Sequence, residues 1–176
     1  MKKLYSFASI YLRAVQLNVL QEAPKETDSE ACGTCGGRCC KRMPGVIHPL
    51  QFGNSSIERI KNMTNALVSK RYAVDCWEGV EEGETNTYYI RPATTKGFTV
   101  YDFSYGGQCT FLGDKGCELE HDRKPAECLG LQPGEGGKNC TEHKTLNKER
   151  LALDEWVKYQ SEVKRAAYAA EKVLGD

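Results

Sequence analysis

Apolar residues recur at helical spacing near both ends of the chain. The N-terminal set has three- and four-residue intervals and predicts an amphipathic helix over residues 3–20; it comprises Leu4, Phe7, Ile10, Tyr11, Ala14 and Val15. A C-terminal set predicts one long helix, or two in series, from about Thr141 to Leu174. Its inward-facing members are Leu146, Leu153, Trp156, Val157, Val163, Ala167, Ala170 and Leu174. We expect both helices to pack on the core. A polar linker follows the N-terminal helix, and the two together make up residues 1–24, ahead of the first cysteines.

Between these ends, the pattern changes from helical to extended. Asn54 or Ser55 can cap a helix that runs to about Lys70, with its inward face formed by Ile57, Ile60, Leu67 and Val68. Residues 85–105 are rich in Thr, Tyr, Val and Phe, which favours strands. The break "TTKG" within them would turn one strand back on another, so we expect a β-hairpin or a small antiparallel sheet.

Residues 106–140 are glycine-rich, irregular and carry four cysteines. Loops of this kind inside a compact domain need support other than a hydrogen-bonded ladder. We therefore expect one small α+β domain over residues 1–176, with helices at both ends, the C-terminal tail being residues 141–176. A small antiparallel sheet and an irregular cysteine-rich core organised by a metal centre would lie between them.

Charge and hydropathy narrow the class of protein. The chain of 176 residues has 24 basic and 24 acidic residues, so no global field attracts nucleic acid or an anionic membrane. Arg13 interrupts the apolar stretch at the start, which argues against a secretory signal, and no run approaches the roughly 18 apolar residues of a membrane helix. We expect a soluble cytoplasmic protein, in which clustered cysteines are metal ligands or catalytic groups more often than disulfides.

Eight of the nine cysteines form two glycine-flanked clusters. The first cluster, C-x2-C-x3-C-C, comprises Cys32, Cys35, Cys39 and Cys40; the second, C-x7-C-x10-C-x11-C, comprises Cys109, Cys117, Cys128 and Cys140. A C-x2-C turn directs two thiolates at a common centre, as in zinc knuckles and iron–sulfur loops. Neighbouring side chains diverge, so Cys39 and Cys40 would ligate different metals or different irons, and they could not form a disulfide with each other without strain.

The residues around the cysteines fit the same interpretation. Glycines beside both clusters permit left-handed turns and let backbone N–H groups approach the sulfurs; they are Gly33, Gly36, Gly37, Gly106, Gly107, Gly113 and Gly116. Nearby cations could offset thiolate charge, although each is equally well explained as a solvated side chain; they are Arg38, Lys41, Arg42 and Lys115. All eight clustered cysteines are therefore candidate metal ligands.

The first cluster together with "CTFLGDKGCELEHDRKPAEC" resembles the zinc- or iron-chelating cysteine-cluster family (YkgJ-like, CxxCxxCC). The family pattern is C-x2-C-x3-C-C, then C-P-F-L, then C-x-I-Y-x-x-R-P-x-x-C. Here Thr110 replaces the proline, Leu119 and Glu120 replace the aliphatic and tyrosine positions, and Lys124 is inserted after the arginine. The resemblance implies a bound zinc ion or iron–sulfur cluster, and it adds Cys140 as a plausible eighth ligand.

The first function consistent with these residues is a structural or binding module that holds zinc or an iron–sulfur cluster, such as 4Fe–4S, and acts through a protein partner. A closed four-thiolate site has no open position for substrate. The alternative is an iron–sulfur redox protein or an enzyme component, since one branch of the family includes flagellin lysine methylases. The sequence assigns no catalytic residue. The short basic patch and neutral charge argue against a zinc-knuckle nucleic-acid binder.

Other residues with possible chemistry have simpler explanations. His48, His121 and His143 lack an H-E-x-x-H or H-x-E context that would mark an open zinc site, so each is expected to be a surface or packing residue. Trp77 and Trp156 are expected in the core. We expect Cys76, which is far from both clusters in the sequence, to be a buried thiol rather than a ligand.

Overall fold

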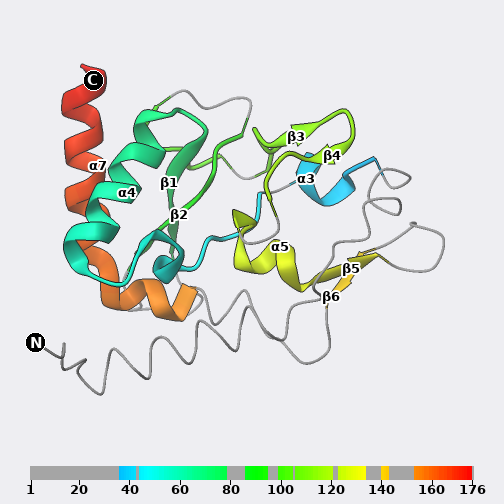
Figure 1. Ribbon diagram of the computed structural model, residues 1–176, viewed down its shortest axis with the longest axis horizontal. Helices are drawn as coiled ribbons and strands as arrows, with labels where there is room; N and C mark the ends of the chain where they lie inside the picture. Colours follow the sequence, from blue (N-terminus) through cyan, green and yellow to red (C-terminus); the bar gives the residue numbers. More distant parts are fainter. Residues whose placement is uncertain are drawn as a thin grey trace, which may run out of the picture.

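A computed structural model describes residues 36–42, 44–78, 86–94, 99–104, 106–120, 123–133, 140–142 and 153–175. The helix expected over residues 3–20 and the linker after it lie outside these ranges. The described elements lie in two regions (Figure 1). Two long helices and a two-stranded sheet form one region, which we call the helical half. Short helices and hairpins that carry the cysteines form the other, the cysteine half.

Helices α4 (Ser56–Val68) and α7 (Gln160–Leu174) pack side by side in the helical half. The Ser55 hydroxyl accepts the Glu58 N–H at 3.2 Å, so α4 begins where the sequence predicts a cap. Its predicted inward face is partly wrong, because Ile57 is 83% exposed. Arg59 is turned inward instead and forms an ion pair with Glu162 of α7 at 2.7 Å.

Strands β1 (Tyr72–Trp77) and β2 (Thr87–Pro92) form the main antiparallel sheet, with Val74 opposite Ile90. This corrects the hairpin expected within residues 85–105. The segment after β2 lies instead on the other side of β1, where Tyr101 makes a parallel bridge to Val74. The small antiparallel sheet is confirmed, but its first strand, "YAVDCW", comes from outside the predicted segment.

The hydrophobic core lies between the sheet, α4, α7 and the short 3-10 helix η1 (Pro49–Phe52). Trp156 is fully buried, as predicted, and its indole N–H donates to the Ile47 carbonyl at 2.8 Å. Trp77 was expected beside it in the core, but this side chain at the end of β1 is 45% exposed. The apolar character of a tryptophan does not by itself decide which face of a strand end is covered.

The C-terminal helical tail is interrupted rather than continuous. Residues 153–156 are helical, η4 (Val157–Tyr159) is a 3-10 turn, and α7 follows. The change of pitch places Val157 in solvent, contrary to the predicted inward face, whereas Val163, Ala167 and Ala170 are buried as expected. Thr141 belongs to a strand, so the helical tail does not begin there.

Short regular elements make up the cysteine half, which the sequence suggested would be irregular: α3 (Arg38–Arg42), β3 (Leu112–Gly113), β4 (Gly116–Cys117), α5 (Ala126–Gly130), β5 (Leu131–Pro133) and β6 (Cys140–Glu142). Strands β3 and β4 form one antiparallel hairpin and β5 and β6 another. The mixture of helices and small antiparallel sheets confirms the expected α+β class. No helix in the described part of the chain has the length and apolar content that crossing a bilayer requires.

Candidate metal centre

The predicted ligands are spread over the elements of the cysteine half. Cys39 and Cys40 are consecutive residues of α3, Cys117 ends β4, Cys128 lies in α5 and Cys140 begins β6. Cys109 forms an isolated antiparallel bridge with Thr94. Cys32 and Cys35 lie outside the described residues, and Cys39 and Cys140 are described by their backbone alone. Consecutive positions such as 39 and 40 are about 100° apart around a helix axis; that they would ligate different metals or different irons of a cluster stays a prediction.

Direct backbone contacts bring the two clusters together. The Cys109 N–H donates to the Cys40 carbonyl at 2.6 Å, and the Gly107 N–H donates to the Arg42 carbonyl at 2.9 Å. The first bond joins a residue of the first cluster to a residue of the second. At this point the chain brings Cys40 and Cys109, one candidate ligand from each cluster, next to each other.

Gly37 allows a second close approach between the clusters. Its φ is +67°, and a Cβ at this position would lie 2.5 Å from the Leu112 Cδ1 atom of β3. A side chain at Gly37 would therefore be strained by the positive φ and would force the Leu112 side chain to shift. The expectation that glycines beside the cysteines permit left-handed turns is confirmed here and at Gly36, whose φ is +64°.

Cys109 and Cys117 lie near one another around the β3–β4 hairpin. Cys117 is paired with Leu112, and the Leu112 N–H donates to the Cys109 carbonyl at 3.0 Å. The Phe111 N–H points at the Cys109 Sγ atom at 3.5 Å. A backbone N–H directed at sulfur stabilises a thiolate, the form in which cysteine binds metal.

Tyr72 is a neighbour of these two thiols that sequence reasoning missed. Burial raises the pKa of its phenol, Arg71 and Arg123 oppose that rise, and Cys109 and Cys117 add to it. The Tyr72 ring also packs on Phe111, with centroids 5.0 Å apart.

Arg71 holds the hairpin onto the sheet. Its Nη2 atom donates to the Thr110 carbonyl at 2.7 Å and to Glu118 at 2.5 Å, and its guanidinium carbon lies 3.9 Å from the centre of the Phe111 ring. The Thr110 hydroxyl donates back to the Arg71 carbonyl at 2.8 Å. Nothing in the local sequence marks Arg71, because its partners follow about forty positions later in the chain, so only pairing information could have identified it.

Cys128 and Cys140 belong to a connected run of elements, α5, β5 and β6. Helix α5 leads directly into β5, and Pro133 of β5 is paired with Cys140 of β6. The start of this run is attached to η1, because the Gln51 side-chain amide donates to the Lys124 carbonyl at 2.8 Å. Lys124, the insertion relative to the family pattern, thus has its backbone engaged in a tertiary contact.

The described side chains do not form a complete metal-binding group: among them, no three His, Cys, Asp or Glu side chains stand close enough to hold an ion. The side chains of four of the eight predicted ligands are not among them: Cys32, Cys35, Cys39 and Cys140. The other four predicted ligands are thiols whose side chains are described; that of Cys109 is 7% exposed and that of Cys117 is exposed. In donor chemistry, this set fits a thiophilic centre such as Zn²⁺ or an iron–sulfur cluster.

Other candidate chemical groups play simpler parts. His48 is buried and its Nδ1 accepts the Leu50 N–H at 3.3 Å, capping η1, which confirms it as a packing residue. Burial lowers its pKa, with Glu155 opposing and Lys158 reinforcing that effect. His121 and His143 lie outside the described residues. The cations near the first cluster, Arg38, Lys41 and Arg42, are exposed, as is Lys115.

Cys76 is half-buried in β1 rather than buried, a correction to the sequence prediction. Burial raises the pKa of its thiol, and Glu78 and Asp75 add to the rise. A raised pKa keeps this sulfur protonated at neutral pH, which makes it a poor nucleophile and a poor ligand. Its position in the helical half agrees with its exclusion from the ligand set.

A groove of about 380 Å³ lies in the helical half, between α7 and the sheet. Its lining is apolar and aromatic apart from Lys164, whose ammonium lies 5.5 Å from the centre of the Tyr88 ring. Apart from Lys164, the titratable groups of its lining are the phenols of Tyr88 and Tyr101.

Comparison with known proteins adds no assignment: no family model, no curated protein and no solved structure matches the chain. The resemblance to the YkgJ-like cysteine-cluster family therefore stays a prediction, carried by the cysteine spacing.

Proposed function

We propose that this chain is a metal-binding protein of the YkgJ-like type, with a thiolate-ligated zinc site or iron–sulfur cluster that holds the cysteine half together for binding a protein partner. Its ligands would be Cys32, Cys35, Cys39, Cys40, Cys109, Cys117, Cys128 and Cys140. The observation that carries the proposal is the 2.6 Å hydrogen bond from the Cys109 N–H to the Cys40 carbonyl. It supports a shared centre because thiolates from separate clusters can serve one site only if the chain brings them together.

One backbone donor is directed at a candidate ligand: the Phe111 N–H lies 3.5 Å from the Cys109 Sγ atom. N–H donors and cations near sulfur offset the charge that several thiolates bring to one site. When bound, the metal would supply a crosslink between short elements that have little core of their own.

Metal content and visible absorption of protein purified without oxygen test the proposal. A colourless protein with bound zinc supports a structural module and directs attention to partners. A brown protein with bound iron and sulfide supports a cluster and brings forward the redox or enzyme-component alternative. Protein that carries neither metal, and that takes up neither zinc nor iron with sulfide on reconstitution, would overturn the proposal.

Three serine variants test the ligand assignment. Cys35→Ser and Cys117→Ser should lose metal, because each removes a predicted thiolate from one of the two clusters. Cys76→Ser is the matched control, since it changes a half-buried cysteine of the helical half and should keep the wild-type metal content. Full metal content in both cluster variants contradicts the assignment.

A further inference from the structure

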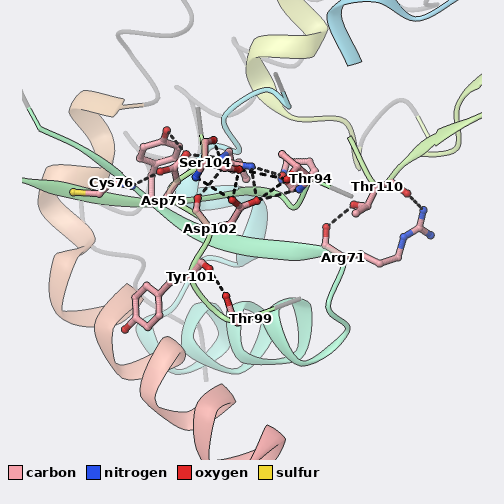
Figure 2. A network of polar contacts seen from close by, with 12 residues as sticks. Arg71, Asp75, Cys76, Thr94, Thr99, Tyr101, Asp102, Ser104 and Thr110 are labelled. Atoms are coloured by element: carbon pink, nitrogen blue, oxygen red, sulfur yellow. Dashed lines mark hydrogen bonds and ion pairs between the residues drawn. The ribbon is translucent and has the colours of Figure 1, made fainter. Parts of the chain in front are cut away.

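A buried network of polar side chains gathers around Asp102 beside the main sheet, with Asp75, Thr94 and Ser104 among its members (Figure 2). The Asp102 side chain is 4% exposed, and its Oδ2 atom accepts the Thr94 N–H at 3.2 Å and the Thr94 hydroxyl at 3.0 Å. Its Oδ1 atom accepts the Ser104 N–H at 3.1 Å and also the Ser104 hydroxyl. Both carboxylate oxygens are therefore satisfied by short-range partners, which fixes the orientation of the side chain.

Arg91 anchors the same network to β1 and β2. Its side chain is 2% exposed; Nη2 donates to the Asp102 carbonyl at 2.8 Å and Nε donates to Asp75 at 2.6 Å. The Arg91 Nη1 atom also lies 3.5 Å from the Asp102 Oδ2 atom, so the carboxylates of Asp75 and Asp102 share one buried guanidinium. The Asp75 carboxylate also accepts hydrogen bonds from the Tyr89 hydroxyl and the Cys76 N–H, whereas the Asp102 carboxylate accepts one from the Thr94 hydroxyl.

Thr94 is where this network meets the cysteine half. It forms an antiparallel bridge with Cys109, and the neighbouring Ala93 carbonyl accepts the Thr110 N–H at 3.0 Å. The Gly107 backbone lies directly on the Thr94 side chain, since a Cβ at Gly107 would be 2.8 Å from the Thr94 Cβ atom. The φ of Gly107, +142°, also disfavours a side chain there.

We infer that Thr94 and Asp102 are positioning residues for Cys109: the Asp102 carboxylate holds the Thr94 hydroxyl, and Thr94 sets where residues 107–110 cross towards Cys40. The consequence for ligation rests on the proposed function. The argument for positioning stands on geometry, because the Cys109 amide that bonds to Cys40 belongs to the residue paired with Thr94. Residues outside the ligand set that orient ligands commonly change metal affinity about 10–100-fold when altered.

Matched substitutions at Thr94 separate the hydroxyl from the methyl group. Thr94→Val keeps the shape and removes the hydroxyl, and Thr94→Ser keeps the hydroxyl and removes the methyl group. Asp75→Asn is the control, because it disturbs the Arg91 network on the side away from Thr94. Asp102→Asn is a second variant with the same target as Thr94→Val.

Two measurements follow on each variant. Amide hydrogen exchange over residues 107–111, in protein stripped of metal, should be faster in Thr94→Val and Asp102→Asn than in wild type, and near wild type in Thr94→Ser and Asp75→Asn. The rate at which bound metal is lost to excess EDTA should rise about tenfold in the first two variants and stay near wild type in the others.

The possible outcomes separate the inference from the proposed function. If Asp75→Asn accelerates exchange and metal loss as much as Thr94→Val does, the effect is general destabilisation and the inference is overturned. The same holds if Thr94→Val is unchanged in both measurements. If wild-type protein binds no metal, the proposed function fails, while the exchange measurement still decides whether Thr94 and Asp102 position the Cys109 segment.

Discussion

The helical half and the cysteine half are held together by different means. In the helical half, α4 and α7 have 13 and 15 residues and cover a sheet whose central side chains are almost completely buried. In the cysteine half, each helix or strand has five residues or fewer. Elements this short bury too little apolar surface to be stable alone, so their contacts depend on backbone hydrogen bonds and on close approach at glycine.

This difference predicts which property a substitution in each half should change. Changes in the helical half should lower global stability, since its side chains form the core. Changes in the cysteine half should act first on local order and metal retention. The predictions below test this division, beginning with the largest expected effect.

Metal removal should have the largest effect. If the cysteines hold a metal, chelation removes a contribution of roughly 10 kcal/mol or more from the cysteine half. Amide protection over residues 112–133 should then collapse, while residues 107–111 keep the part that the Thr94–Cys109 bridge provides and protection in α4 and α7 is retained. Hydrogen exchange before and after EDTA treatment measures this, and simultaneous loss of protection in both halves would show that they form one cooperative unit.

Trp156→Ala should be the most damaging single substitution in the helical half. The side chain is fully buried and its N–H satisfies the Ile47 carbonyl at 2.8 Å. We expect a loss of about 3–5 kcal/mol in the free energy of unfolding, from the cavity and the unsatisfied carbonyl together. Urea denaturation measures it. A loss below about 1 kcal/mol would place the site outside the usual range for a core tryptophan.

Gly37→Ala and Gly36→Ala test close approach in the cysteine half. Both residues have positive φ, so each alanine should cost about 1–2 kcal/mol in backbone strain. At Gly37 the added Cβ also meets Leu112 at 2.5 Å, whereas at Gly36 the nearest atom is the Lys41 Nζ at 3.6 Å. We expect Gly37→Ala to cost about 1 kcal/mol more, because Leu112 must move. Equal losses in local exchange protection would remove the argument for close approach.

Acidic pH should weaken the contact between α4 and α7. The Arg59 guanidinium, through its hydrogen bond and charge, lowers the pKa of Glu162 below its ordinary value of 4.5, against the opposing effect of burial. The pair therefore stabilises the fold above about pH 4.5, and this stabilisation is lost as the pH falls through the lower folded-state pKa.

Glu162→Gln is the matched control for that effect. At neutral pH it should be less stable than wild type by about 1.5 kcal/mol, since a charged hydrogen bond is replaced by a neutral one in a site that is 12% exposed. The difference should shrink as the pH falls towards 3. Urea midpoints measured across this range would contradict the assignment if the difference between the two proteins stayed constant.

Sequence patterns identified features that depend on neighbouring residues. Helical spacing and the Ser55 cap predicted α4, and the same spacing predicted the buried face of α7 at Val163, Ala167 and Ala170. The glycines at positions 36 and 37 indicated left-handed turns, which the backbone shows. Cysteine spacing defined the candidate ligands, and it did so without information on their three-dimensional arrangement.

Tertiary structure decided which distant segments meet. The strand "YAVDCW" (β1) is the partner of β2. The segment that was predicted to pair with β2 lies instead on the other side of β1, where Tyr101 is bridged to Val74. The exposure of Ile57 and Trp77 followed from which faces other elements cover. The bridge between Thr94 and Cys109 is likewise a contact that only the tertiary structure shows. Local propensity arises from interactions within a few residues, whereas strand partners, helix faces and buried polar networks depend on contacts between residues that the sequence places far apart.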